Sequence, residues 1–214
     1  MTDGFSALTA DLLQQRHYIR GQALAARIAL PAETRETLTR QLEGQLDALI
    51  AHLDPISLGF CWPYRAEPDL RGWVQRWLAG SARRLAALPV VLDKDRPLVF
   101  RPWTNSVAME ADRHGIPHPA GGAEVLPELL LVPLNAFDAQ GFRLGYGGGY
   151  FDRTLAAHKV LAVGVGFELG RVDTVYPQDH DKPMDWLVTE AGSWSCAAAR
   201  NVLPGPGRTA DDQG

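Results

Sequence analysis

Hydrophobic residues recur at helical spacing in three stretches of the first half of the chain. Residues 9–29 are expected to form the first helix, with Thr9 as its N-cap. Residues 31–52 are expected to form the second, because Pro31 suits a first helical turn and Leu42, Leu46 and Leu49 lie on one face. Residues 69–79 are expected to form the third, which Gly80 should end.

Short apolar runs separate these helices and continue after them, and each predicts a buried strand. Several are continuously apolar, which is typical of sheets that are covered on both faces. The alternation of strands and helices predicts a three-layer α/β fold with helices on both faces of the sheet. We expect a single α/β domain over residues 1–191, an irregular segment at 104–123 and a disordered tail over residues 192–214. The strands are expected at residues 56–60, 87–93, 97–103, 128–134, 160–167 and 185–190.

The composition of the chain indicates the cellular compartment and the classes of partner to expect. The 214 residues carry a formal net charge of −4, which gives no general attraction to nucleic acid or to an anionic membrane. The two cysteines are far apart and lack metal-ligand spacing, so we expect a reducing compartment and no zinc site. The N-terminal residues do not resemble a secretory signal, and no apolar run is long enough to cross a bilayer. A cytoplasmic protein is expected.

A glycine-rich segment between a strand and a helix is the most distinctive part of the sequence. Residues 130–153 read LLVPLNAFDAQGFRLGYGGGYFDR, with glycines at positions 145, 147, 148 and 149. Such a loop can bring backbone N–H groups close to a phosphate at a helix N-terminus, but it can equally be a tight turn. It lacks both the P-loop ending and the dinucleotide-binding spacing. Glycine content alone leaves the two interpretations even.

Charged residues beside the loop favour the phosphate interpretation. Arg143 and Arg153 flank the glycines and can neutralise phosphate oxygens. Asp152 would repel a phosphate unless a cation lay between them, so it suggests Mg²⁺. The alternative is that Asp152 is an ordinary acidic residue in the first turn of a helix.

Other polar residues have both a structural and a functional interpretation. Arg16, Arg20 and Arg27 form an arginine row at helical spacing, and a solvated helix face is the favoured interpretation of this row. The alternative is that Arg16 and Arg20, one helical turn apart, reach one polyanion. Asp181 belongs to an acidic cluster that is typical of a solvated loop, but it could be a second metal ligand. Glu67 could cap a helix, or it could anchor a ligand in an aromatic pocket to which His114 would contribute. No histidine is placed in a recognisable nucleophile motif.

Together these segments resemble the 5-formyltetrahydrofolate cyclo-ligases, also called methenyltetrahydrofolate synthetases. The resemblance runs from about residue 16 to residue 190 and follows the family's order. Its long and specific motif is VPLNAFDAQGFRLGYGGGYFDRTL, and its shorter ones are RHYIR, YRAEPDL, HGIPHP and DHDKPMDWLVTE.

The resemblance implies a Rossmann-like fold and an ATP- and Mg²⁺-dependent ring closure that converts 5-formyltetrahydrofolate to 5,10-methenyltetrahydrofolate with ADP and phosphate. Arg143 and Tyr150 would be catalytic. Mg²⁺ would be held by Asp152 and Asp181, and the folate by Glu67, His114 and Tyr150. ATP would be held by Arg16, Arg20, Arg143, Gly145, Tyr146, Gly147, Gly148, Gly149 and Arg153.

Three positions depart from the family pattern. Arg16 replaces the usual lysine, His114 replaces an aromatic residue that can stack on the ligand, and Phe151 stands where tyrosine is common. These changes leave the phosphate and metal ligands in place, so we interpret them as tuning activity. A non-catalytic nucleotide- or folate-binding protein is the alternative, kept open by His114. A sugar-phosphate isomerase or acyl-CoA transferase is disfavoured by the paired arginines and Asp152. We expect a monomer that acts on small molecules, with a glycine loop that closes on ATP.

Overall fold

A seven-stranded, mostly parallel sheet forms the centre of the protein. The structure, a computed structural model, describes residues 3–197, and side chains from residue 11 onward. The strand order is β11-β10-β9-β6-β1-β2-β3, with parallel pairing throughout except at the antiparallel edges β3 and β11. The strands are β1 (Ser57–Gly59), β2 (Leu85–Val90), β3 (Val99–Trp103), β6 (Leu129–Pro133), β9 (Leu161–Val165), β10 (Trp186–Thr189) and β11 (Gly192–Ser195).

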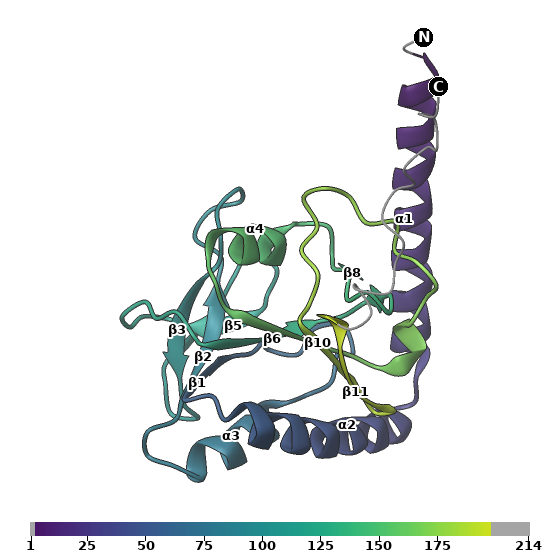
Figure 1. Ribbon diagram of the computed structural model, residues 1–214. Coiled ribbons are helices and arrows are strands. Elements are labelled where there is room, and N and C mark those ends of the chain that lie inside the picture. Colours follow the sequence, from purple (N-terminus) through teal and green to yellow (C-terminus); the bar gives the residue numbers. More distant parts are fainter. Residues whose placement is uncertain (1–2, 198–214) are drawn as a thin grey trace, which may run out of the picture.

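Helices cover both faces of this sheet, as the sequence predicted. Helices α2 (Ala32–Leu53) and α3 (Arg71–Ala79) lie on one face, and α4 (Tyr150–Ala157) lies on the other (Figure 1). Side chains of β6 alternate between the two cores. Leu129 and Leu131 belong to the cluster with α2 and α3, whereas Leu130 and Val132 belong to the cluster beside α4. A central strand that is buried on both faces explains why its sequence is continuously apolar.

The boundaries of α2 follow from its sequence. Pro31 precedes the first turn, and Asp54 ends the helix in the left-handed conformation (φ 43°) while its N–H donates to the Ile50 carbonyl. The apolar face predicted from helical spacing is buried and consists of Leu42, Leu46, Leu49 and Ile50. The helix therefore anchors its side of the sheet by hydrophobic burial.

Helix α1 (Asp3–Ala29) begins earlier than expected, so Thr9 lies inside the helix and is not its N-cap. It stands upright at one side of the sheet and extends beyond it (Figure 1). Polar residues attach this helix to the rest of the protein, since Arg16 and Arg27 are both buried. The favoured interpretation of the arginine row as a solvated face is therefore wrong for these two residues.

Three short structures were not predicted. Two small antiparallel hairpins consist of β4 (Met109–Ala111) with β5 (Pro117–Pro119), and of β7 (Ala136–Phe137) with β8 (Arg143–Leu144). Strand β11 also corrects the expected tail, since residues 192–195 pair with β10; residues 198–214 lie outside the described part of the chain. Strands of two to four residues are too short to show a hydrophobic period.

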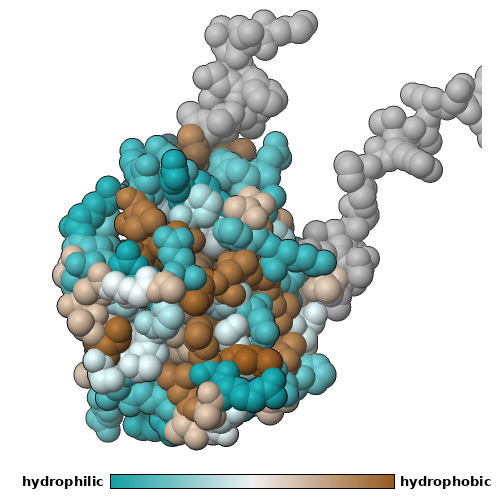
Figure 2. Space-filling view, turned by 90° about the vertical axis from the view of Figure 1, so that its left-hand side faces the viewer, coloured by the Kyte–Doolittle hydropathy of each residue, from teal (hydrophilic) through white to brown (hydrophobic). Residues whose placement is uncertain are grey.

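The β3 side of the molecule carries no wide, purely apolar surface. Apolar and hydrophilic groups are interspersed on this face (Figure 2). Within residues 3–197, no helix is long and apolar enough to span a bilayer.

Candidate functional site

The β7–β8 hairpin sets the start of the glycine loop. Its turn is organised by buried Asp138, whose Oδ1 accepts the N–H groups of Gln140 and Phe142 at 3.1 Å. Burial raises the pKa of Asp138, and these backbone donors oppose that rise. Gly141 has φ 90°, and a Cβ there would lie 2.8 Å from the Met184 carbonyl oxygen. The turn therefore requires glycine and delivers Arg143 to the site.

The glycine loop enters α4 through backbone conformations that favour glycine. Gly147 has φ 94°, and Gly149, the residue before α4, has φ 64°. A Cβ on Gly148 would lie 2.7 Å from the Tyr150 ring, whereas a Cβ on Gly145 or Gly147 would meet no described atom within 4 Å. The loop thus leaves open space at the N-terminus of a helix, where backbone N–H groups and the helix dipole favour an anion.

Two arginines predicted to bind ATP contact carbonyl groups of this loop. Arg20 Nε donates to the Gly145 carbonyl at 2.7 Å, and burial together with the neighbouring Arg16 lowers the pKa of Arg20. Arg153 Nη2 donates to the Gly148 carbonyl at 2.8 Å and to the Lys94 carbonyl at 2.8 Å. Both guanidinium groups are therefore at the loop.

Arg143 and Asp152, which flank the glycines in the chain, form an ion pair. The Nη1 of Arg143 lies 3.1 Å from Oδ1 of Asp152, and it also donates to the Lys182 carbonyl at 3.2 Å. The same carboxylate oxygen accepts the Lys182 N–H at 3.1 Å. Among the described residues no hydrogen bond of Asp152 Oδ2 is seen, which leaves that oxygen to bind a cation.

Arg16 and Asp181 lie in the same region but bind each other. Their contact is bidentate, at 2.7 and 3.1 Å, and both residues are buried. Arg16 also donates to the Tyr176 carbonyl at 2.7 Å, and Asp181 accepts the Gln178 N–H at 2.8 Å. Both oxygens of Asp181 accept described donors, so Asp181 would have to leave this pair before it bound a metal ion.

The donor set therefore suits Mg²⁺ at Asp152 better than at Asp181. Within residues 3–197 there is no group of three or more His, Cys, Asp or Glu side chains placed to hold a metal ion. Mg²⁺ is commonly bound by one or two carboxylates together with substrate phosphates and water, so a single carboxylate beside a phosphate loop is sufficient.

Glu67 contacts the loop through Tyr146 and lies at the end of a strained turn. Arg65 and Ala66 have φ values of 46° and 62°, which are uncommon for residues other than glycine. Glu67 Oε2 accepts the Tyr64 N–H at 3.0 Å, and Oε1 accepts the Tyr146 hydroxyl at 2.8 Å. Burial raises the pKa of Glu67. The glycine loop and the expected folate anchor are thus in direct contact.

Arg27 completes this contact and was not assigned a site role from the sequence. Its guanidinium donates to the Tyr146 hydroxyl at 2.7 Å and lies 3.9 Å from Glu67 Oε1. It also donates to the carbonyl groups of Arg65 and Leu134, both at 3.1 Å. Its spacing from Arg16 and Arg20 places it on the same helix face, and that was the available signal.

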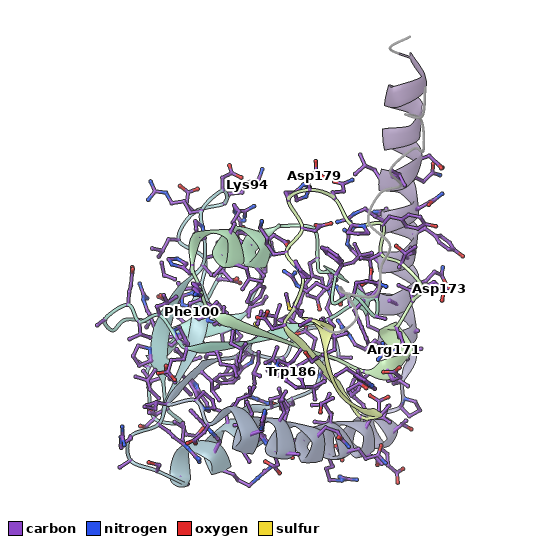
Figure 3. The ribbon with its side chains drawn as sticks, in the orientation of Figure 1. Lys94, Phe100, Arg171, Asp173, Asp179 and Trp186 are labelled. Carbon is purple, nitrogen blue, oxygen red and sulfur yellow. The ribbon has the colours of Figure 1, made fainter. Side chains whose placement is uncertain are left out.

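His114 and Tyr150 are brought together at the other end of the loop. Arg113 joins them, since its Nη2 donates to the Tyr150 hydroxyl at 2.7 Å and its Nε donates to His114 Nε2 at 3.2 Å. A cavity of about 350 Å³ lies nearby, lined by Val91, Leu92, Asp93, Lys94, Asp112, Arg113 and His118. In Figure 3, the loops that carry Lys94 and Asp179 lie to the left and to the right of α4.

Comparison with known proteins agrees with this geometry. Residues 13–190 match the model of the 5-formyltetrahydrofolate cyclo-ligase family. The chain belongs to this family. The resemblance inferred from the motifs is thereby confirmed.

Relatives in the cyclo-ligase family align over different lengths. The 5-formyltetrahydrofolate cyclo-ligase of Mycolicibacterium smegmatis is 30% identical over 190 residues, covering 82% of this chain and 94% of that protein. The cyclo-ligase of Escherichia coli (strain K12) is 37% identical over 78 residues, covering 33% of this chain and 43% of the relative. The match to the Haemophilus influenzae cyclo-ligase covers 54% of that relative. The chain thus spans about half the length of these last two relatives.

Solved structures of the family have the same architecture. The NMR structure of Aquifex aeolicus 5,10-methenyltetrahydrofolate synthetase matches with a TM-score of 0.75 and 26% identity, covering 92% of this chain and 99% of that one. A Mycoplasma pneumoniae 5,10-methenyltetrahydrofolate synthetase matches with a TM-score of 0.66, covering 82% of this chain and 98% of that one; at 19% identity it supports the fold alone. The predicted α/β fold class is confirmed.

Proposed function

We propose that this cyclo-ligase family member catalyses the ATP-dependent cyclisation of 5-formyltetrahydrofolate to 5,10-methenyltetrahydrofolate, with release of ADP and phosphate. It would then be a carbon–nitrogen ring-closing ligase of folate one-carbon metabolism. The observation that carries the proposal is the position of the glycine loop. The ion-paired residues Arg143 and Asp152 flank the glycines in the chain, and Tyr146 within the loop contacts Glu67.

The reaction needs two displacements. The formyl oxygen attacks the γ-phosphorus of ATP, the bond to the ADP oxygen breaks, and an O-phosphorylated formyl group results. N10 then attacks the activated carbon and loses its proton, the carbon–oxygen bond breaks, and the departing phosphate carries away that oxygen. The protein must hold two substrates in line and neutralise the charge that develops on phosphate, so it needs no nucleophile of its own.

The residues around the loop suit those tasks. Arg20, Arg143 and Arg153 are proposed to bind the phosphates, together with the backbone N–H groups of residues 145–149. Asp152 is proposed to hold Mg²⁺, which would shield the charge of the triphosphate oxygens. Arg16 stays a proposed phosphate ligand, and Asp181 stays a proposed metal ligand only if its ion pair with Arg16 opens.

On the folate side, Glu67 is proposed to accept hydrogen bonds from the ring edge. Tyr150 and His114 are proposed to contact the rest of the substrate. Arg143 and Tyr150 are proposed to be the catalytic groups, because both are attached to the segment that would carry the γ-phosphate. Their functional assignment follows from the family motif and from their position beside the loop.

The direct experiment mixes purified protein with 5-formyltetrahydrofolate, ATP and Mg²⁺, and follows the ultraviolet absorbance of methenyltetrahydrofolate. We expect one ADP per product, and no product when a hydrolysis-resistant ATP analogue replaces ATP. Binding of both ligands without turnover would favour the alternative of a non-catalytic binding protein. Absence of both binding and product would overturn the proposal.

We also propose that the enzyme is a cytoplasmic monomer that acts on these small molecules. The composition, with two widely spaced cysteines and no strong basic excess, supports this setting. Light scattering coupled to size-exclusion chromatography tests the monomer: a dimer mass at micromolar concentration would contradict it.

A further inference from the structure

The glycine loop is tied to the rest of the protein at three of its residues. Arg20 and Arg153 donate to the carbonyl groups of Gly145 and Gly148, and the Tyr146 hydroxyl donates to Glu67 and accepts a hydrogen bond from Arg27. Two of the three ties are therefore made by arginines that carry a charge suited to phosphate. The third reaches the carboxylate that is suited to the folate.

We propose that Tyr146 is a latch that occupies Glu67 until a nucleotide triphosphate binds the glycine loop. Here "latch" means the hydrogen bond from the Tyr146 hydroxyl to Glu67 Oε1. The proposal rests on the proposed function, because it assigns Glu67 to folate and the loop to ATP. It predicts that nucleotide promotes folate binding.

Exchange of hydrogen-bond acceptors provides the driving force. A charged phosphate oxygen is a stronger acceptor for a guanidinium group than a neutral carbonyl oxygen is. Phosphates that entered the loop would therefore draw Arg20 and Arg153 away from the Gly145 and Gly148 carbonyls. The loop would then lose two of its three ties to the body of the protein.

The loop can move once those ties are broken. A Cβ on Gly145 or Gly147 would meet no described atom within 4 Å, so this backbone is not packed against the core. Glycine also has wide access to backbone conformations. Tyr146 is 41% exposed, which means that its ring can leave Glu67 without opening a buried cavity.

Glu67 stays prepared for a ligand after Tyr146 leaves. Oε2 keeps the Tyr64 N–H, and Arg27 is held near Oε1 by its bonds to the Arg65 and Leu134 carbonyls. The buried carboxylate thus keeps its counter-charge, while departure of Tyr146 vacates the Arg27 Nη2 donor and one acceptor position on Glu67. A ring edge with adjacent N–H donors, such as the amide and amino groups of a pterin, would fill it.

Isothermal titration calorimetry can measure the coupling. 5-Formyltetrahydrofolate is titrated into wild-type protein with and without a hydrolysis-resistant ATP analogue and Mg²⁺. We expect the analogue to tighten folate binding on the order of tenfold, which corresponds to one hydrogen bond to a charged group. By linkage, folate must tighten the binding of the analogue by the same factor.

The Tyr146→Phe variant tests the residue itself. It lacks the hydroxyl, so we expect it to bind folate on the order of tenfold more tightly than wild type in the absence of nucleotide. Addition of the analogue should then change folate affinity little. Tyr18→Phe is the matched control, because Tyr18 is 66% exposed on α1; it should keep the wild-type coupling.

The possible outcomes separate the latch from the proposed function. Weaker folate binding by Tyr146→Phe with the coupling intact would overturn the latch, because Tyr146 would then orient Glu67 for the ligand. Wild-type protein that binds both ligands independently would overturn the latch alone. Wild-type protein that binds neither ligand would overturn the proposed function together with it. The coupling between nucleotide and folate binding is measured on wild-type protein, so the latch can be tested even if Tyr146→Phe folds poorly.

Discussion

Arg16 and Asp181 form a buried, bidentate ion pair across 165 residues of sequence, with Nη1 of Arg16 2.7 Å from Oδ2 of Asp181. The pair attaches α1 to the segment that leads into β10. It also places the Asp181 carboxylate next to Lys182, whose N–H reaches Asp152. The segment that carries Asp181 thus contacts Asp152, but only Asp152 has an oxygen that no described residue occupies.

The first prediction concerns the stability that this pair provides. Arg16→Met leaves the Asp181 carboxylate buried without its partner, so we expect a loss of about 3–5 kcal/mol in the free energy of unfolding, measured with urea. Adding Asp181→Asn should recover part of that loss. Arg71→Met is the control, because Arg71 pairs with Asp69 at the surface and should cost about 1 kcal/mol or less. Additive effects of the two buried changes would contradict the coupling.

The second prediction concerns the metal. Asp152→Asn keeps a side-chain oxygen that can accept from Arg143 and Lys182, so the fold should survive. It removes the negative charge, so turnover should fall by about 10²–10³-fold, and the Mg²⁺ concentration for half-maximal rate should rise. Steady-state rates across a Mg²⁺ series measure both. Asp173→Asn changes an exposed acid and should leave both values unaltered. Unchanged activity of Asp152→Asn at limiting Mg²⁺ would refute the assignment.

Much of this fold could be predicted because residues that are buried in regular helices and strands recur at characteristic spacings in the sequence. The continuous apolar run of β6 and the helical spacing of Leu42, Leu46 and Leu49 are direct consequences of their positions in two cores. The β7–β8 hairpin could not be predicted, because its two-residue strands depend on the side-chain hydrogen bonds of Asp138. Strand β11 depends on pairing with β10, which sequence periodicity does not record.

The sequence indicated which charged residues accompany the glycine loop, but it did not indicate the ion pairs that these residues form. Arg143, Arg153 and Asp152 were assigned from their nearness to the glycines, and Arg20 from its match to the family's N-terminal basic pair. In the structure Arg20 and Arg153 hydrogen-bond the loop, and Arg143 pairs with Asp152. The partner of each charged side chain depends on contacts between segments that are far apart in the sequence. Arg27 belongs to the same arginine row, but nothing local in the sequence indicates that it meets Glu67.

The third prediction compares two glycines of the loop. Gly147 has φ 94°, so Gly147→Ala forces a side chain into a conformation that costs about 1–2 kcal/mol, although open space surrounds the new methyl group. Gly145 has similar space without a positive φ, so Gly145→Ala should change the free energy of unfolding by less than about 0.5 kcal/mol. Urea unfolding of both variants measures the difference. Equal stabilities would show that the strain at Gly147 is relieved by movement of the loop.

The fourth prediction follows from the raised pKa of Glu67, whose first cause is burial and whose rise is opposed by Arg27, Tyr146 and the Tyr64 N–H. Because the folded state holds this proton more tightly than the unfolded chain, whose glutamate titrates near about 4.3, ionisation of Glu67 lowers stability as the pH rises through that range. Glu67→Gln cannot ionise and removes this contribution.

The stability of Glu67→Gln relative to wild type should therefore increase as the pH rises from below about 4.3 to above the folded-state pKa of Glu67, and then become constant. Urea unfolding at several pH values gives this difference, and the effects of Asp138, whose pKa is also raised by burial, cancel because both proteins contain it. Glu36→Gln, at an exposed position of α2, is the control. A difference that falls with rising pH would mean that Arg27 stabilises the Glu67 carboxylate by more than burial destabilises it.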